Sequence, residues 1–384
     1  MDKYYRRTYQ WRQLLCVVAL PFMALLTACS SSDDTAEDTG NLVTLETLKA
    51  EVDSDIDGVT RVKMGDNDGT ANGEDLRTYF ENGDRIYTSV TFEHDGMQHC
   101  YEHSGGGIFN STNSPLQFST TKNQHLIAFY RGDYESTGAH RQRLRNGYTF
   151  MVPTDQSNEK GTKANPGFED GEFLYAHHEV DNSILDANGW PTLQFKHKTS
   201  RIILRVHLID DTAVDDDGTV IGTEFKADYV TEAYIGCSTT PTTTGAGTSP
   251  TVNNNNQSSN QSGSADGLIY TNSVVTLDEN PESATYGNMT LNTITTNNGN
   301  NNNYRKVLKA LRRQKGDKEV WFTVIFPPQS FTAPSNGFFN VVFKRNNGTA
   351  ANYLFPLLLA RNCQEGKVYY FDVLIGSHKP NSGI

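Results

Sequence analysis

The sequence lacks several features that would quickly assign a protein to a class. No long helical period occurs, and the longest apolar run, residues 14–26, is too short to cross a membrane as a helix. The common motifs of serine hydrolases, zinc proteases and phosphate-binding loops are absent, so we predict no enzyme activity. Positive charge is in the minority, because 33 lysines and arginines face 45 aspartates and glutamates. The resulting net charge of −12 argues against binding to nucleic acid or to anionic lipid.

Cysteine is also scarce, and the spacing of its five positions excludes a zinc knuckle or a redox pair. Cys16 and Cys29 belong to the N-terminal segment. Cys100, Cys237 and Cys363 show no C-x-x-C spacing. These three residues allow one disulfide and leave at least one free thiol, and the sequence does not say which.

The first 28 residues have the pattern of a secretory signal, since a basic head precedes the apolar run. The run closes in Leu26-Thr27-Ala28-Cys29, which resembles the lipobox of bacterial lipoproteins. The resemblance implies cleavage between Ala28 and Cys29 by a signal peptidase and attachment of lipid to Cys29. It also implies a surface-exposed lipoprotein of the cell outer membrane. The alternative is an ordinary signal peptide that happens to contain a cysteine.

After the signal, the sequence predicts an acidic tether that is followed almost wholly by strands and turns. Residues 30–40 have no large apolar side chain, which predicts a flexible segment. Leu48, Ala50 and Val52 alternate with charged residues and predict a short, half-buried strand. Further alternating or apolar runs predict strands at 86–92, 97–101, 193–195, 202–208, 320–326, 338–343, 353–359 and 368–375. The predicted class is therefore all-β.

Regular short strands favour β-sandwiches, and a mature chain of about 355 residues favours two domains. We expect an N-terminal sandwich at 62–188 and a C-terminal sandwich at 189–384. Before them lie the signal at 1–28 and, at 29–61, the tether, the first strand and a connector. Two segments rich in Asn, Thr and Ser, 238–266 and 295–303, are expected to be mobile insertions of the second domain.

Six stretches of the sequence, taken together in their order, are similar to a known family. They are Gly58-Val59-Thr60-Arg61, Asn82 to Ile86, Asp155-Gln156 with Phe168 and Phe173 to Ala176, Leu193 to Ser200 with the strand after it, Phe326 to Gln329, and Gly366 to Tyr370. In this order they resemble the fimbrillin family, the FimA-like subunits of type V pili from Bacteroidota-type anaerobes. The resemblance covers roughly residues 42–375.

The resemblance implies two transthyretin-like β-sandwich domains in tandem and assembly with other fimbrial subunits by exchanged strands. In the family, an Arg-specific protease cuts the connector and releases the first strand. Arg61 is the only Lys or Arg between Lys49 and Lys63, so Arg61 and the following Val62 match that position. The removable strand would then carry Leu48, Ala50 and Val52. The alternative is that Arg61 is an ordinary loop arginine.

The end of the sequence departs from the family pattern. Shaft subunits usually carry one more strand, the donor, after the Lys-Val-Tyr strand. Here residues 376–384, which include Pro380 and show no alternation, follow Ile375. We therefore expect a terminal or accessory fimbrial subunit, with residues 368–375 as donor being the alternative.

Three other groups of residues resemble ligand-binding motifs, and none predicts a cofactor. The run from Asp53 to Gly58 begins like a calcium loop, but its twelfth position is Met64 instead of a glutamate. The histidines and the cysteine between 94 and 103 fall on a predicted hairpin, where they cannot converge on one metal ion. Arg131-Gly132-Asp133 is the tripeptide that integrins bind at a loop tip, but it follows an apolar stretch and could end a strand.

Two functions of different classes fit these observations. The first is a fimbrial subunit that serves cell adhesion and binds a host or bacterial surface receptor. The second is a surface glycan-binding lipoprotein of a polysaccharide uptake system, which would need an aromatic platform built on Trp190 or Trp321. A glycan-binding module has no use for a removable first strand, so that strand and the Arg61 connector distinguish the two functions.

Overall fold

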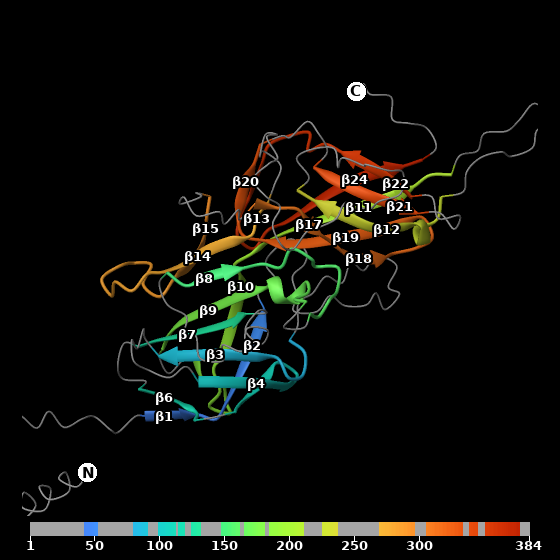
Figure 1. The fold of residues 1–384 in the computed structure, drawn as a ribbon. Coiled ribbons are helices and arrows are strands. Elements are labelled where there is room, and N and C mark those ends of the chain that lie inside the picture. The colour runs from blue at the N-terminus through green and yellow to red at the C-terminus, as the bar shows by residue number, and fades with distance from the viewer. Residues whose placement is uncertain are drawn as a thin grey trace, which may run out of the picture. The chain divides into compact units, whose positions relative to one another are not determined.

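A computed structural model of the protein describes residues 42–52, 80–90, 99–112, 114–119, 124–131, 147–161, 165–180, 184–210, 225–236, 269–295, 305–332, 338–344 and 350–376. Regular structure in these ranges consists of strands and of two short 3-10 helices, Glu169–Gly171 and Ala227–Tyr229 (Figure 1). The prediction of an all-β protein is confirmed. Over the same ranges, no helix has the length and hydropathy needed to cross a membrane.

Seven strands of the first half close into a barrel in the order β10-β2-β5-β4-β3-β7-β9. They are β2 (Thr47–Val52), β3 (Arg85–Val90), β4 (His99–Gly105), β5 (Ile108–Ser111), β7 (Gln124–Arg131), β9 (Phe173–Val180) and β10 (Thr192–His197). Alternate side chains point inward and build one apolar core, as the two-residue period of strands requires. β3 and β4 pair antiparallel, with Ile86 opposite Tyr101 and Thr88 opposite His99, as the predicted hairpin requires; its turn lies outside the described residues.

The barrel is closed, whereas a sandwich was predicted, and the reason is the position of β2. This strand pairs with β10 on one side and with β5 on the other. Without β2, the remaining six strands would form an open sheet that ends in β5 and β10. A smaller two-stranded sheet joins β1 (Leu42–Leu45) to β6 (Leu116–Ser119).

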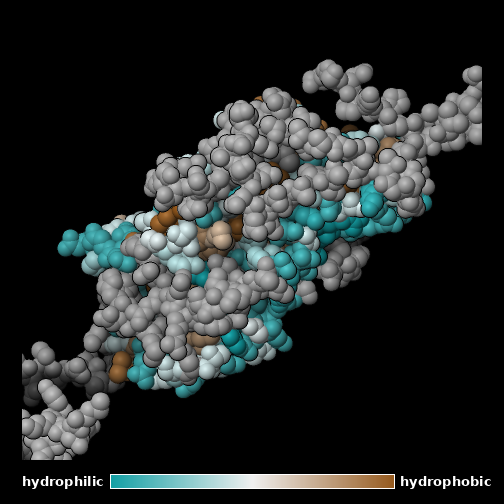
Figure 2. Space-filling model, in the orientation of Figure 1, coloured by the Kyte–Doolittle hydropathy of each residue, from teal (hydrophilic) through white to brown (hydrophobic). Residues whose placement is uncertain are grey.

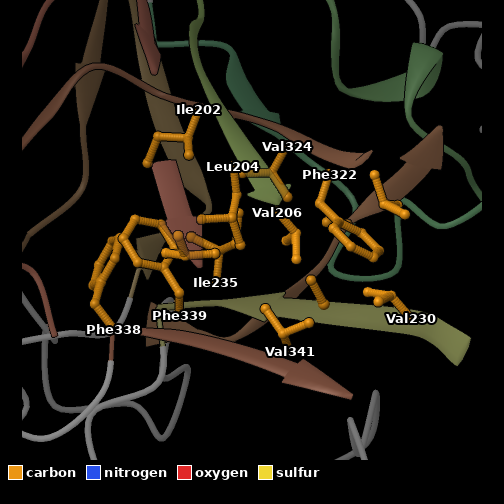
Figure 3. Close-up of a cluster of buried hydrophobic side chains, with 14 of the residues drawn as sticks. Ile202, Leu204, Val206, Val230, Ile235, Phe322, Val324, Phe338, Phe339 and Val341 are labelled. Atoms are coloured by element: carbon orange, nitrogen blue, oxygen red, sulfur yellow. The ribbon is translucent and has the colours of Figure 1, made fainter. Parts of the chain in front are cut away.

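Two four-stranded sheets of the second half pack face to face. One has the order β18-β19-β11-β24 and the other β17-β12-β21-β22. Their bounds are β11 (Ser200–Leu208), β12 (Val230–Ile235), β17 (Leu308–Lys309), β18 (Leu311–Gln314), β19 (Glu319–Phe326), β21 (Phe339–Lys344), β22 (Ala350–Phe355) and β24 (Val368–Ile375). Figure 3 shows apolar side chains of the two layers pointing toward each other, including Leu204, Phe322 and Val341. The predicted strands at 202–208, 320–326 and 368–375 are confirmed.

A third sheet covers part of the barrel from outside. It contains β8 (Thr149–Met151), β14 (Asn272–Leu277) and β15 (Met289–Thr293) in the order β15-β14-β8. Its apolar residues share a core with outward-facing residues of β3, β7 and β9, so these barrel strands are buried on both faces. Two further strand pairs join β13 (Ile269–Tyr270) to β16 (Arg305–Lys306), and β20 (Gln329–Phe331) to β23 (Arg361–Cys363).

The two halves share strands across the boundary expected at residues 188 and 189. β10 follows that boundary in sequence but completes the barrel, and β14 and β15 pack on barrel strands. Residues 43–384 form one compact unit. The division into two domains therefore stays a prediction.

A buried charge cluster fixes the short link between β10 and β11. The Glu172 carboxylate is fully buried and accepts hydrogen bonds from His197 Nδ1 at 2.9 Å, Thr199 Oγ1 at 2.8 Å and Arg201 at 3.1 Å. Burial alone would raise the pKa of Glu172, but His197 and Arg201 hold it below its ordinary value. Because these partners flank the link, the cluster sets the direction in which the chain leaves the barrel.

Candidate functional site

The candidate site is the place that β2 occupies in the barrel. β2 runs parallel to β10, with Lys49 opposite Thr192 and Val52 opposite Phe195. On its other side it runs antiparallel to β5, with Thr47 opposite Asn110. We call the position between β5 and β10, together with the core side chains beneath it, the strand slot. A strand in the slot is hydrogen-bonded along both edges.

The inward side chains of β2 belong to the barrel core. Leu48 is 0% exposed and Ala50 is 2% exposed, and the partly buried Val52 packs against the same cluster. The predicted strand with its three apolar residues is therefore confirmed. Full burial of a leucine side chain contributes about 1.5–3 kcal/mol, so β2 is an integral part of the core.

The turn between β4 and β5 lies close against the strand slot. The Ala50 backbone N–H donates to the Gly107 carbonyl at 2.9 Å. Gly107 has a φ of +74°, and a Cβ on it would lie 3.1 Å from the Ala50 carbonyl oxygen. Glycine at position 107 thus lets the turn approach the middle of the inserted strand.

The outward side chains of β2 contact both neighbouring segments. Lys49 Nζ lies 2.6 Å from Asp186 Oδ2 and 5.7 Å from the centre of the Trp190 ring. Further along, Gln194 donates to the Glu51 carboxylate at 3.0 Å. On the β5 side, the Thr47 hydroxyl donates to Asn110 at 3.0 Å. These ion-pair and hydrogen-bond contacts hold β2 in the slot in addition to its apolar contacts with the barrel core.

The two described residues that flank the connector both lie on the barrel core. Val52, the last residue of β2, packs on the barrel core, and the chain next enters the described structure at Phe80. Phe80 is buried in the same core, with its ring 5.0 Å from that of Phe109 and 5.5 Å from that of Phe195. A cut between these two points would separate β2 from the rest of the chain without breaking a described strand.

Several predicted site residues lie outside the described residues. They are Ala28, Cys29, Arg61 and Val62, together with the calcium-like run from Asp53 to Met64. The insertion at 238–266 and most of the one at 295–303 also lie there. The roles predicted for these residues stay predictions.

Other predicted constellations have ordinary structural roles where the structure describes them. His99 Nδ1 lies 2.7 Å from the Ser114 carbonyl oxygen, and His103 Nε2 accepts the Gly107 N–H at 3.1 Å. Among the residues described, no group of three or more His, Cys, Asp or Glu side chains is arranged to hold a metal ion. Arg131 is buried at the end of β7 and stacks 4.4 Å from the centre of the Tyr148 ring, so it is not presented at a loop tip.

The tryptophans give little support to an aromatic platform. Trp321 is buried, Lys315 Nζ lies 4.7 Å from its ring centre, and its indole N–H donates to Glu319. The other candidate, Trp190, is partly buried beside Lys49. On the face in Figure 2, most of the described surface is hydrophilic, and hydrophobic residues occupy only small areas.

Two of the comparisons with known proteins found no match. No protein-family model and no curated protein matches the chain. Among solved structures, the chain is similar to a candidate cell adhesion protein from Bacteroides ovatus, with a TM-score of 0.40 and 12% identity over 86% of this chain and 92% of that one. A candidate cell adhesion protein from Bacteroides uniformis has a TM-score of 0.40 and 15% identity, covering 86% and 93%. The tip fimbrial protein Mfa3 from Porphyromonas gingivalis has a TM-score of 0.31 and 8% identity, covering 78% and 92%.

Proposed function

We propose that this protein is a fimbrial subunit of the fimbrillin type, whose first strand is removed and replaced by a strand of another subunit. The observation that carries the proposal is the position of β2. It is hydrogen-bonded to β5 and β10 on its two sides, fills the barrel core with Leu48 and Ala50, and precedes a connector. The N-terminal part of the chain thus supplies a central strand of the barrel.

Removal of β2 would convert the closed barrel into an acceptor for an extended chain. The facing edges of β5 and β10 would present unpaired N–H and C=O groups, which cost free energy when they are buried without partners. The core side chains beneath the slot would be exposed to water at the same time. A strand from another subunit would restore both the hydrogen bonds and the apolar contacts.

The proposed processing steps involve residues that lie outside the described ranges. Cleavage between Ala28 and Cys29 by a signal peptidase, followed by lipid attachment to Cys29, would deliver the protein to the outer surface of the cell. Cleavage after Arg61 by an Arg-specific protease would leave Val62 as the new N-terminus. We propose a terminal or accessory place in the fimbria, in contact with other subunits and serving adhesion.

The N-terminus of the protein recovered from assembled fimbriae tests this function. We expect it to begin at Val62, and we expect an Arg61→Ala variant to keep its N-terminal segment and to stay out of fimbriae. A Lys63→Ala variant is the matched control, because it removes a neighbouring positive charge and leaves Arg61 in place. Assembled fimbriae whose subunits still begin at lipidated Cys29 would contradict the proposal.

A further inference from the structure

The loop that faces Lys49 is built to hold a carboxylate in place. Within the loop 184–191, Asp186 Oδ1 accepts the backbone N–H groups of Asn188 at 2.8 Å and Trp190 at 3.0 Å. The Asp186 N–H donates to the Trp190 carbonyl and the Gly189 N–H donates to the Asp186 carbonyl, both at 2.9 Å. All four bonds are internal to the loop. The second carboxylate oxygen, Oδ2, is therefore aimed at the slot without any help from β2.

A cation at position 49 completes this arrangement. Lys49 Nζ lies 2.6 Å from Asp186 Oδ2, near the Trp190 ring, and the Lys49 backbone N–H donates to the Pro191 carbonyl at 2.9 Å. The hydrogen bond from Lys49, followed by the N–H of Trp190, lowers the pKa of Asp186 to about 2. The carboxylate thus keeps its charge at any pH near neutral.

The slot distinguishes the residues on either side of Lys49 by the size of their side chains. Leu48 is completely buried and fills a large apolar space, whereas Ala50 is buried beside the turn that contains Gly107. A larger side chain at position 50 would overpack a closed core, which usually destabilises it. The slot thus distinguishes three consecutive residues, which are a large apolar, a basic and a small one.

The second half of the chain uses the same tripeptide in the same way. Leu308-Lys309-Ala310 repeats the sequence of residues 48–50. Leu308 and Ala310 are buried in the sandwich core, and Lys309 Nζ lies 2.9 Å from the Glu232 carboxylate of the neighbouring strand β12. The pattern of burial and charge pairing is therefore repeated at an independent place in the fold.

We propose that the strand slot selects its incoming strand by this pattern, with Asp186 and Trp190 as the receptor for the basic residue. The occupant is an extended segment of another fimbrial subunit that carries a large apolar, a basic and a small residue in succession and runs parallel to β10. The inference rests on the proposed function and adds to it the chemistry of the partner.

The test uses the full chain with a site for a sequence-specific protease inserted between Val52 and Phe80. After cutting, a labelled peptide with the sequence of residues 42–52 competes with the resident strand, and its affinity is measured by fluorescence anisotropy. We expect Lys49→Ala in the peptide to weaken binding about three- to fivefold, and Lys49→Glu to weaken it further. Ala50→Leu in the peptide should weaken binding at least about tenfold.

The matched control is a Glu51→Ala peptide, whose altered side chain is exposed and accepts a hydrogen bond from the Gln194 amide. It should bind within about twofold of the unaltered peptide. Equal binding of the unaltered, Lys49→Ala and Lys49→Glu peptides would overturn the inference while strand exchange itself stood. Failure of every peptide to enter the cut protein would instead overturn the proposed function, and the inference with it.

Discussion

β2, the first strand of the barrel in sequence, and β24, the last strand of the described chain, are placed alike but paired differently. Each runs parallel to one of two consecutive strands, β2 to β10 and β24 to β11. β2 is also paired with β5, whereas β24 has β11 as its single strand partner among the described residues. Leu48 of β2 is fully buried, but Leu374 of β24 is 62% exposed. Removing β2 would leave two facing strand edges unpaired, whereas removing β24 would leave one unpaired edge and would uncover the core residues that Val373 and Ile375 cover.

This difference indicates which strand can create a receptor. Loss of a central strand leaves two unpaired edges and exposes the apolar core between them. Together these favour insertion of another strand. Among the described strands, an edge strand such as β24 leaves one unpaired edge, that of β11, when it is removed. That β24 acts as a donor stays a prediction.

The largest effect is expected at the buried cluster around Glu172. This cluster fixes the link between β10 and β11, which are the parallel partners of β2 and β24. Glu172→Ala would leave Arg201 buried without its carboxylate, and such losses cost about 3–5 kcal/mol. Denaturant unfolding measures the loss. Glu365→Ala is the control, because its partner Lys198 sits in a partly exposed pair of 2.6 Å, and it should cost less than about 1 kcal/mol. Equal costs for the two variants would contradict a structural role for the buried cluster.

The second prediction compares a buried residue of β2 with an exposed residue of β24. Leu48→Ala deletes buried atoms of the barrel core and should lower the free energy of unfolding by about 2–5 kcal/mol. Leu374→Ala, on the exposed face of β24, should change it by less than about 0.5 kcal/mol. Both values come from the same denaturant titration. A similar loss in both variants would remove the distinction between the strands.

The third prediction uses pH to weaken the half that contains β2. Burial raises the pKa of Glu169 to about 8 and that of Asp84 to about 6, although Lys160 Nζ lies 3.9 Å from Glu169. Both groups bind protons more tightly in the folded protein. Their stabilisation is complete below the unfolded pKa of about 4 and is lost as pH rises through 6 and 8. The free energy of unfolding should therefore fall between pH 5 and pH 8.5.

Glu169→Gln isolates this effect, since glutamine cannot lose a proton. The variant should show a flatter dependence on pH above about 6.5, as measured by denaturant unfolding at a series of pH values. Asp84→Asn should flatten the lower part of the range instead. A wild-type slope that persists unchanged in both variants would show that other groups cause it.

The smallest effect is expected at the charged contacts of β24. Asp372 lies 2.7 Å from Arg205 and 3.0 Å from His207, and its side chain is half exposed. Such surface pairs contribute about 0–1 kcal/mol, so Asp372→Asn should lower stability by no more than that. A loss as large as that of Leu48→Ala would mean that β24 is held as firmly as β2.

Much of the strand content could be predicted from the sequence because side-chain alternation is a local property. The run 368–375 coincides with β24, and Leu48, Ala50 and Val52 lie on β2 as expected. The partners of β2 could not be predicted in this way. β10 lies more than 130 residues further along the chain, and no local pattern in either strand specifies that they pair.

The contacts of buried polar side chains were the least predictable feature of the structure. The Gln156 side chain donates to the Ile325 carbonyl and accepts the Ile325 N–H, both at 2.8 Å, and thereby replaces a backbone partner of β19. Gln329 does the same for Tyr270. Both glutamines lie in stretches that carry the family resemblance, but their role depends on strands distant in sequence. Asp186 likewise reads as part of a turn, since its contact with Lys49 appears only in the folded barrel.

The most direct test of the account identifies what occupies the strand slot in the assembled protein. A photoreactive residue in place of Gln194, which contacts Glu51 of β2, would form a covalent adduct with its neighbour in fimbriae on the cell surface. The same residue in place of Arg205, which contacts Asp372 of β24, serves as the reference. The account predicts an adduct from position 194 to a different polypeptide chain. An adduct from position 194 to residues 42–52 of the same chain, in assembled fimbriae, would contradict it.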